Sequence, residues 1–331
     1  MSEPTLARSI LITGGNGFIG SRLCHFFIEK GWRVIASVRE NSDLSLLDKL
    51  PVELRHGDIT KPETLTEMVV DVDVIIHNAG LIKARNKDTF YAVNVEGTKN
   101  LFEVVLSNKK LQKIVYVSSL AAAGPSSKGK PLTEAQECNP ITLYGRSKLA
   151  GEQAALSFSD RLNVTVVRPP AVYGPGDREV FSFFQTLFYH VKPLLGNSSR
   201  RVQMVHVEDL CRGIYQATVS ETESGAVYFI CENRSYKYGE LVSLLHKASG
   251  KRAIPLVIPG SLLKVIAALS ERLFRSVGAT PMLTVEKANE LLAWWEIDTT
   301  LASEEINFTS AIPFAEGAEQ TYDWYRRKGW L

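Results

Sequence analysis

The sequence predicts an α/β fold in which helices cover both faces of a doubly wound parallel sheet. In the first half of the chain, short runs rich in β-branched residues alternate with stretches of helical periodicity, which is typical of successive strand–helix–strand units. Several of these runs are apolar on both faces, as expected for strands buried between two helical layers. Hydrophobic residues make up 45% of the 331 positions, enough to form a sizeable core.

The expected elements divide the chain into two parts. Strands are predicted at residues 9–13, 33–38, 52–56, 74–78, 113–118 and 164–168, and helices at 18–30, 61–69, 89–107 and 143–158. After about residue 170 the alternation ends. Helices are then expected at 180–189, from about 208, and at 237–249, 261–276 and 284–293, with a strand at 202–207 and a final aromatic helix. We expect residues 1–175 to form mainly the sheet domain. Residues 176–331 should form mainly a smaller α-rich cap, interleaved with late sheet elements at about 202–230.

A glycine-rich turn joins the first strand to the first helix. It reads Gly14-Gly15-Asn16-Gly17-Phe18-Ile19-Gly20, with the spacing G-x-x-G-x-x-G. Glycines let the backbone turn sharply and come close to a pyrophosphate, where a Cβ would obstruct. The helix N-terminus adds free N–H groups and the positive end of a dipole. Because strand, loop and helix follow in the required order, the turn predicts a Rossmann-type dinucleotide site.

The end of the second strand bears on which dinucleotide would bind. An NAD site usually places an acid there for the ribose 2′-hydroxyl, but Val38 holds that position and Arg39 follows. An arginine can pair with a 2′-phosphate, so NADP(H) is favoured over NAD(H). Glu40 keeps NAD(H) open, because a one-residue shift of the loop would let it bind a 2′-hydroxyl.

Tyr144 and Lys148 lie at positions i and i+4 of a predicted helix, so their side chains share one face. A nearby ammonium and a positive nicotinamide would both favour the phenolate and lower the pKa of Tyr144, which could then exchange a proton with a substrate oxygen. The fifth strand ends at Ser118 and Ser119, on the carboxyl edge where ligands bind in open α/β sheets. A serine there can orient the reacting oxygen, although capping of the strand end is the expected role of one of the two.

These features together resemble the extended branch of the short-chain dehydrogenase/reductase superfamily, which includes the NAD-dependent epimerases and dehydratases. The resemblance also covers Gly57-Asp58-Ile59, His77-Asn78-Ala79-Gly80, Asn94 in an N-x-x-G-T segment, and residues 168–175 and 206–210. It implies a catalytic triad of Ser119, Tyr144 and Lys148. It also implies a cofactor site formed by Gly14, Gly17, Phe18, Ile19, Gly20, Arg39, Asp58, Ile59, Ala79, Gly80, Tyr144, Lys148, Pro169 and Val172.

The substrate class is narrowed by two departures from the sugar-modifying members. Sugar dehydratases carry an Asp-Glu pair beside the serine, as elimination requires, whereas Ser119 is followed by Leu120-Ala121-Ala122-Ala123. Val202 occupies a position where many sugar-nucleotide enzymes have an arginine, although Arg201 is adjacent. Aromatic residues then gather in the cap at 181–189, where some would be core and others would suit a flat apolar ligand.

The arrangement therefore resembles the 3β-hydroxysteroid dehydrogenases and dihydroflavonol-type reductases. This implies hydride transfer between NADP(H) and a secondary alcohol or ketone on a bulky apolar substrate, steroid-, flavonoid- or isoprenoid-like. An NAD-dependent nucleotide-sugar epimerase is the alternative, and a non-catalytic cofactor-binding sensor or scaffold is a third hypothesis. Relatives pair through the helices at 89–107 and 143–158, so a homodimer is also implied.

Charge and composition bear on other partners. The net charge of +2 comes without long runs of one sign, so no nucleic-acid partner is expected. The four cysteines are scattered and have no neighbouring histidine ligands, which predicts no metal site and reduced thiols in a cytoplasmic protein. The apolar stretch 261–274 contains Lys264, Glu271 and Arg272 and is too short and too charged to span a bilayer. Its helical spacing leaves open whether its apolar stripe packs within the cap or meets lipid.

Overall fold

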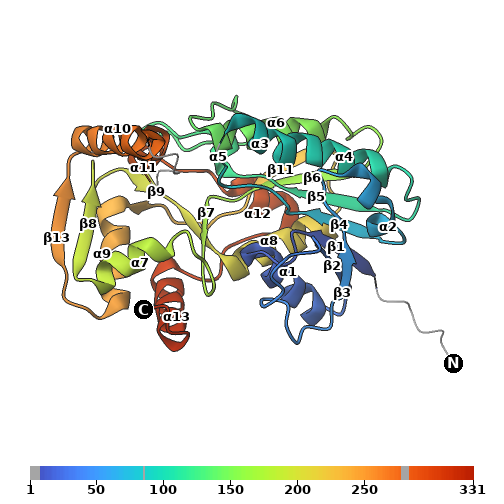
Figure 1. Ribbon diagram of the computed structural model, residues 1–331, viewed down its shortest axis with the longest axis horizontal. Coiled ribbons are helices and arrows are strands. Elements are labelled where there is room, and N and C mark those ends of the chain that lie inside the picture. Colours follow the sequence, from blue (N-terminus) through green and yellow to red (C-terminus); the bar gives the residue numbers. More distant parts are fainter. Residues whose placement is uncertain (1–7, 85, 277–282) are drawn as a thin grey trace.

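A seven-stranded parallel sheet forms the centre of the sheet domain, in the order β11-β6-β5-β4-β1-β2-β3 (Figure 1). The computed structural model describes residues 8–84, 86–276 and 283–331. The strands are β1 (Ser9–Thr13), β2 (Arg33–Val38), β3 (Glu53–His56), β4 (Val74–His77), β5 (Lys113–Val117), β6 (Val164–Arg168) and β11 (Ala226–Phe229). The predicted fold class is confirmed, and β1, β2 and β6 have the predicted bounds.

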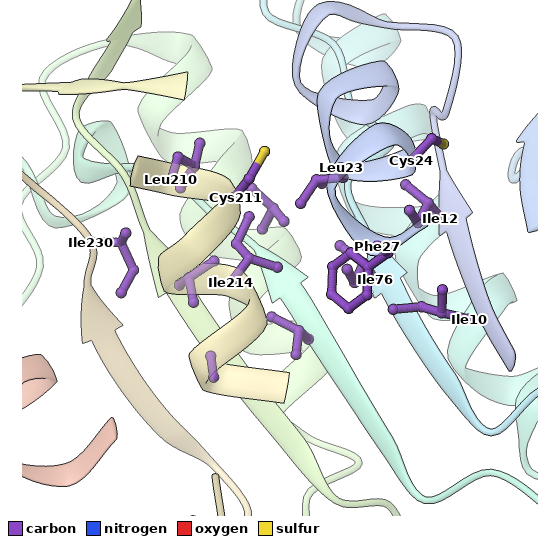
Figure 2. Close-up of a cluster of buried hydrophobic side chains, with 14 of the residues drawn as sticks. Ile10, Ile12, Leu23, Cys24, Phe27, Ile76, Leu210, Cys211, Ile214 and Ile230 are labelled. Atoms are coloured by element: carbon purple, nitrogen blue, oxygen red, sulfur yellow. The ribbon is translucent and has the colours of Figure 1, made fainter. Parts of the chain in front are cut away.

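Helices cover both faces of this sheet. The helices of the sheet domain are α1 (Phe18–Glu29), α2 (Thr66–Val69), α3 (Lys87–Tyr91), α4 (Gly97–Val105), α5 (Leu120–Ala123), α6 (Leu143–Leu156), α8 (Val207–Val219) and α12 (Thr300–Ile306). Side chains of β1 alternate between two buried clusters. Ile10 and Ile12 join α1, α8 and α12, while Leu11 joins α2, α4 and α6, as the two-residue period of a strand requires. Figure 2 shows the first cluster, with Leu23 and Phe27 of α1 beside Cys211 and Ile214 of α8.

The strand order reverses between β1 and β4. The chain runs from β1 through β2 to β3 at one edge and then returns to β4 on the other side of β1. The ends of the two strands are in register, with Thr13 opposite His77. Helical connections diverge at such a switch point, and ligands of open α/β sheets bind at the carboxyl ends of the strands there.

The predicted helix at 89–107 is divided into three parts. Between α3 and α4 the chain makes a π-helical segment at Ala92–Glu96. Such wide turns are rare and often mark functional sites. The predicted helix at 61–69 is also shorter, because a 3₁₀ turn at Pro62–Thr64 precedes α2.

The cap contains small sheets as well as helices. Its helices are α7 (Phe181–Phe188), α9 (Tyr238–Ser249), α10 (Gly260–Ser276), α11 (Val285–Leu292) and α13 (Phe314–Arg327). Its strands form three pairs, which join β7 (Ala171–Tyr173) to β10 (Met204–His206), β9 (Arg201–Val202) to β12 (Tyr236–Lys237), and β8 (Val191–Leu195) to β13 (Ile254–Ile258). No helix within the described ranges is both long enough and apolar enough to cross a bilayer. The division of the chain at residue 175 stays a prediction.

Candidate active site

The glycine loop between β1 and α1 is closed in a way that only glycines permit. Gly14 has a φ of +66°, and the N–H of Gly17 donates to its carbonyl at 3.0 Å. A Cβ on Gly20 would lie 2.1 Å from the same carbonyl oxygen. The loop therefore folds tightly onto the start of the helix, which is the backbone approach that a pyrophosphate site needs.

The N-terminus of α1 suits an anion. Gly17 is the N-cap and supplies no side-chain partner to the first N–H groups, and the first turn carries no acidic residue. These donors and the helix dipole stay available for phosphate oxygens. Phe18 and Ile19 are half-buried beside them. The residues present therefore fit the pyrophosphate of a dinucleotide.

A buried hydrogen-bond network joins the ends of β1 and β4. The Thr13 hydroxyl lies 2.8 Å from Nδ1 of His77 and accepts the N–H groups of Asn78 and Ala79 at 3.1 and 3.0 Å. The other ring nitrogen of His77 lies 3.1 Å from the hydroxyl of Thr98. Burial lowers the pKa of His77 to about 3, so the ring is neutral. The network fixes the turn that leads from Ala79 to Gly80.

Asn94, in the π-helical segment, connects that turn to α6. Its carboxamide oxygen accepts the N–H of Leu81 at 2.7 Å, and its nitrogen donates to the carbonyl of Leu81 and to the hydroxyl of Ser147. A Cβ on Gly80 would lie 3.1 Å from the Asn94 oxygen and 3.8 Å from Nζ of Lys148. The π-helical segment thus places an amide between the candidate cofactor turn and the candidate catalytic helix.

Lys148 is buried, and backbone and side-chain oxygens hold its ammonium. Nζ donates to the carbonyl of Val117 at 2.8 Å and to the hydroxyl of Tyr116 at 3.2 Å. Burial lowers the pKa of Lys148 to about 8, while the charge of Glu152 acts in the opposite direction. Lys148 is therefore a buried cation at neutral pH, and it loses its charge in mildly alkaline solution.

Tyr144 lies one helical turn before Lys148, and Ser119 faces it from the start of α5. The hydroxyl of Ser119 caps α5 by accepting the N–H of Ala121 at 3.1 Å. Burial raises the pKa of Tyr144 to about 12, and a hydrogen bond with Ser119 acts against this rise. The sequence predicts that Lys148 lowers the pKa of Tyr144. Instead, removal of the phenol from water dominates, so Tyr144 is a protonated acid at neutral pH.

The candidate adenine end lies at the tips of β2 and β3. Arg39 is exposed, and its backbone N–H donates to the hydroxyl of Ser42. Burial alone would raise the pKa of Asp58, but hydrogen bonds from Thr60 and the charge of Arg39 leave it below its usual range. Ile59 is buried. Arg39 and Asp58 are thus close enough for their charges to interact, at the edge where the ribose of a dinucleotide would lie.

Pro169 and Val172 follow β6. The carbonyl of Pro169 accepts the N–H of Leu120 at 2.8 Å, which ties this segment to the start of α5 beside Ser119. Val172 lies in β7, opposite Val205 of β10. Both predicted residues therefore lie at the carboxyl edge of the sheet.

A buried ion pair behind the candidate triad was missed by the sequence reasoning. Arg168 and Glu152 form a salt bridge, and the hydroxyl of Ser118 donates to the same carboxylate at 2.6 Å. Both charged side chains are at least nine-tenths buried. A charged residue at the end of an apolar strand was the available signal, but its partner on α6 could be found only in the fold. Ser118 therefore faces Glu152, whereas Ser119 faces Tyr144.

Comparison with known proteins identifies the family. A family model described as the NAD-dependent epimerase/dehydratase family matches residues 10–231. The chain belongs to this family. It is 33% identical to a ceramide reductase of Caulobacter vibrioides, over 99% of this chain and 98% of that one. It is 28% identical to a 3-beta-hydroxysteroid dehydrogenase of Mycolicibacterium neoaurum, over 79% of this chain and 76% of that one.

The family resemblance extends to solved structures. A UDP-glucose 4-epimerase from Thermotoga maritima superposes with a TM-score of 0.79, over 97% of this chain and 99% of that one. At 22% identity this likeness supports the fold alone. As a member of the epimerase/dehydratase family, with dehydrogenases and reductases among its relatives, the chain is an NAD(P)-dependent enzyme of the short-chain dehydrogenase/reductase type.

Proposed function

We propose that the enzyme transfers hydride between NADP(H) and a secondary alcohol or ketone on a bulky apolar substrate. The observation that carries the proposal is similarity, over nearly the whole chain, to a relative named as a reductase of ceramide. The site agrees with this substrate class. The segment that follows Ser119 consists of Leu120, Ala121, Ala122 and Ala123, all of them buried and none of them ionisable.

The proposed mechanism runs most directly as reduction. The glycine loop and the N-terminus of α1 would hold NADPH, which when bound would supply the hydride. Ser119 would orient the carbonyl oxygen, and Tyr144 would donate its proton to that oxygen as negative charge develops. The raised pKa of Tyr144 keeps the proton in place until then. Lys148, held by Tyr116 and the carbonyl of Val117, would stabilise the phenolate that remains.

The cofactor preference depends on Arg39. An exposed guanidinium at the end of β2 can pair with a ribose 2′-phosphate. Its positive charge would also offset the repulsion between that phosphate and the neighbouring Asp58. We therefore infer NADP(H) in preference to NAD(H). Calorimetric titration with NADP⁺ and NAD⁺ tests this inference. Arg39→Ala should abolish the preference, and an unchanged preference would contradict it.

The nucleotide-sugar alternative meets an obstacle in the cap. Arg201, which could bind a substrate diphosphate, and the neighbouring Arg200 both have other partners. Arg200 is buried, with its guanidinium 3.6 Å from the ring centroid of Tyr238. Arg201 donates to the hydroxyl of Ser235 at 2.7 Å and lies 3.6 Å from Glu296. Epimerisation would therefore need other cations near the substrate.

The decisive assay compares two substrate classes. Purified enzyme with NADPH should reduce apolar ketones, such as steroid 3-ketones or long-chain 3-oxo lipids, and should leave UDP-glucose unchanged. Tyr144→Phe should remove turnover while it keeps NADPH binding. Epimerisation of UDP-glucose without added cofactor, or full reductase activity in Tyr144→Phe, would overturn the proposal. Binding of NADPH without turnover of either class would favour the cofactor-sensor hypothesis. The homodimer and the cytoplasmic location stay predictions.

A further inference from the structure

Helix α10 carries two apolar stripes, and only one of them is buried. Leu263 and Ala267 pack into a cluster with α11 and β8. The opposite stripe contains four apolar side chains at helical spacing, which are exposed by 41–63%: Leu262, Val265, Ile266 and Leu269. Single exposed apolar residues are ordinary, but a contiguous stripe marks a site of interaction. One apolar stripe of α10 therefore packs within the cap, and the other is exposed.

The strand before α10 also carries exposed apolar residues. Ile254, Leu256 and Val257 of β13 are exposed by 77%, 49% and 64%. Figure 1 shows β13 at the outer edge of the cap, where it leads directly into α10. We call these residues of β13, together with the exposed stripe of α10, the distal apolar surface. It lies at the end of the molecule away from β3 (Figure 1).

The exposed charged residues near the distal apolar surface are mainly basic. Lys264 and Arg272 of α10 are exposed, and so are Lys251 and Arg252 just before β13. The carboxylate of Glu271 points elsewhere, because it accepts the N–H of Val285 at 2.9 Å. A basic, apolar helix face is typical of helices that lie in the interface of an anionic membrane. A second copy of the chain would bring the same basic residues against one another.

We propose that the distal apolar surface docks the enzyme on the surface of an anionic lipid bilayer. The proposal deepens the proposed function, on which it rests in one respect: a bulky apolar ketone partitions into membranes, so an enzyme that acts on it gains by working there. The exposed stripe of α10 would enter the headgroup region, and Arg272, which flanks this stripe on the helix, would contact lipid phosphates. The enzyme would lie on the membrane without crossing it.

Vesicle flotation of the full-length protein tests the proposal. The probes are phosphatidylcholine vesicles with and without phosphatidylglycerol. The wild type should float with the anionic vesicles, and the pair Val265→Ser and Leu269→Ser should weaken binding by about tenfold or more. Arg272→Glu should weaken binding by about fivefold or more, and Lys264→Glu, on the far flank of the helix, should weaken it less. Val70→Ser, at an exposed valine of the sheet domain, is the matched control and should bind as the wild type does.

Two readouts separate this proposal from the proposed function. All variants should keep wild-type NADPH-dependent activity on a short, water-soluble ketone, while the serine pair and Arg272→Glu lose activity on a ketone embedded in anionic vesicles. Wild-type protein that reduces the soluble ketone but ignores vesicles would overturn the docking proposal and leave the function standing. Vesicle binding without reduction of any ketone would overturn the proposed function and leave the docking proposal standing. A dimer that the serine pair dissociates, with vesicle binding unchanged, would assign the surface to a second copy and overturn docking.

Discussion

The buried ammonium of Lys148 should make the stability of the enzyme depend on pH, and Lys148→Met should remove that dependence. Burial lowers the pKa of Lys148 from 10.5 to about 8 in the folded chain. Between these two values the unfolded chain binds more protons than the folded chain, so stability rises with pH. Below pH 8 the folded state bears the full free-energy cost of burying the charged ammonium. Above pH 10.5 both states are neutral and the cost disappears.

The magnitude follows from the shift. Each pKa unit corresponds to about 1.4 kcal/mol, so the charge costs about 3 kcal/mol below pH 8. Between pH 7 and pH 10 most of this cost is relieved in the wild type, and none of it exists in Lys148→Met. The stability of the variant relative to the wild type should therefore fall by about 2–3 kcal/mol over that interval. Loss of the hydrogen bonds to Val117 and Tyr116 lowers the unfolding free energy of the variant by the same amount at both pH values. This contribution therefore cancels when the two pH values are compared.

Urea unfolding of the cofactor-free proteins at pH 7 and pH 10 measures this difference. Groups that titrate in both proteins cancel in the comparison. Lys128→Met, at an exposed lysine, should show no such change between the two pH values. A stability difference between Lys148→Met and the wild type that is the same at both pH values would refute the burial argument. It would mean that water reaches the ammonium in the folded state.

Further predictions concern the candidate site and the cap. The rate of ketone reduction should fall as pH rises through about 8, where Lys148 loses its proton, and a pH–rate profile of Lys148→Arg should lack this inflection because the guanidinium stays charged. Gly20→Ala places a Cβ 2.1 Å from a carbonyl oxygen and should weaken NADPH binding by about tenfold or more in a calorimetric titration; wild-type affinity would contradict the tight loop. Glu152→Gln leaves Arg168 buried without its counter-charge and should lower the unfolding free energy by roughly 3–5 kcal/mol, which the further change Arg168→Met should partly restore. Phe184→Ala should lower stability by about 3–5 kcal/mol in urea unfolding without changing the KM for an apolar ketone; a selective change in KM would place Phe184 against the substrate.

The sheet domain could be predicted closely because its strands obey a strong physical constraint. Parallel strands covered on both faces form nearly continuous apolar runs, and the five residues of β1, with Ile10, Leu11 and Ile12 at its centre, are all buried. The pair β8 and β13 offered no such pattern. Each of these strands contains a proline, Pro193 and Pro255, a residue that argues against a strand unless the strand is short or lies at an edge.

The candidate site could be predicted in its residues but not in its electrostatics. Glycine, tyrosine and lysine occur at fixed spacings because the chemistry requires them, so the cofactor loop and the Tyr144–Lys148 pair were visible in the sequence. Their pKa values depend on burial and on partners from other elements. Tyr116, which holds Lys148, comes from the middle of a buried strand and looks like any core residue. The π-helical segment that positions Asn94 is likewise a departure from a pattern that reads as one continuous helix.

The cap resists prediction because an apolar residue there can serve the core, the substrate or an external surface. The aromatic run in α7 illustrates the first use. Phe184 is fully buried, and Phe181 packs on Tyr325 and Trp330, so these rings stabilise the cap itself. The exposed stripe of α10 follows the same helical spacing and faces outward. Helical periodicity indicates that a face is apolar, but only the fold shows what covers that face. Substrate selection should therefore be sought where the cap faces Ser119 and Tyr144, and access to an apolar substrate should be sought at the distal apolar surface.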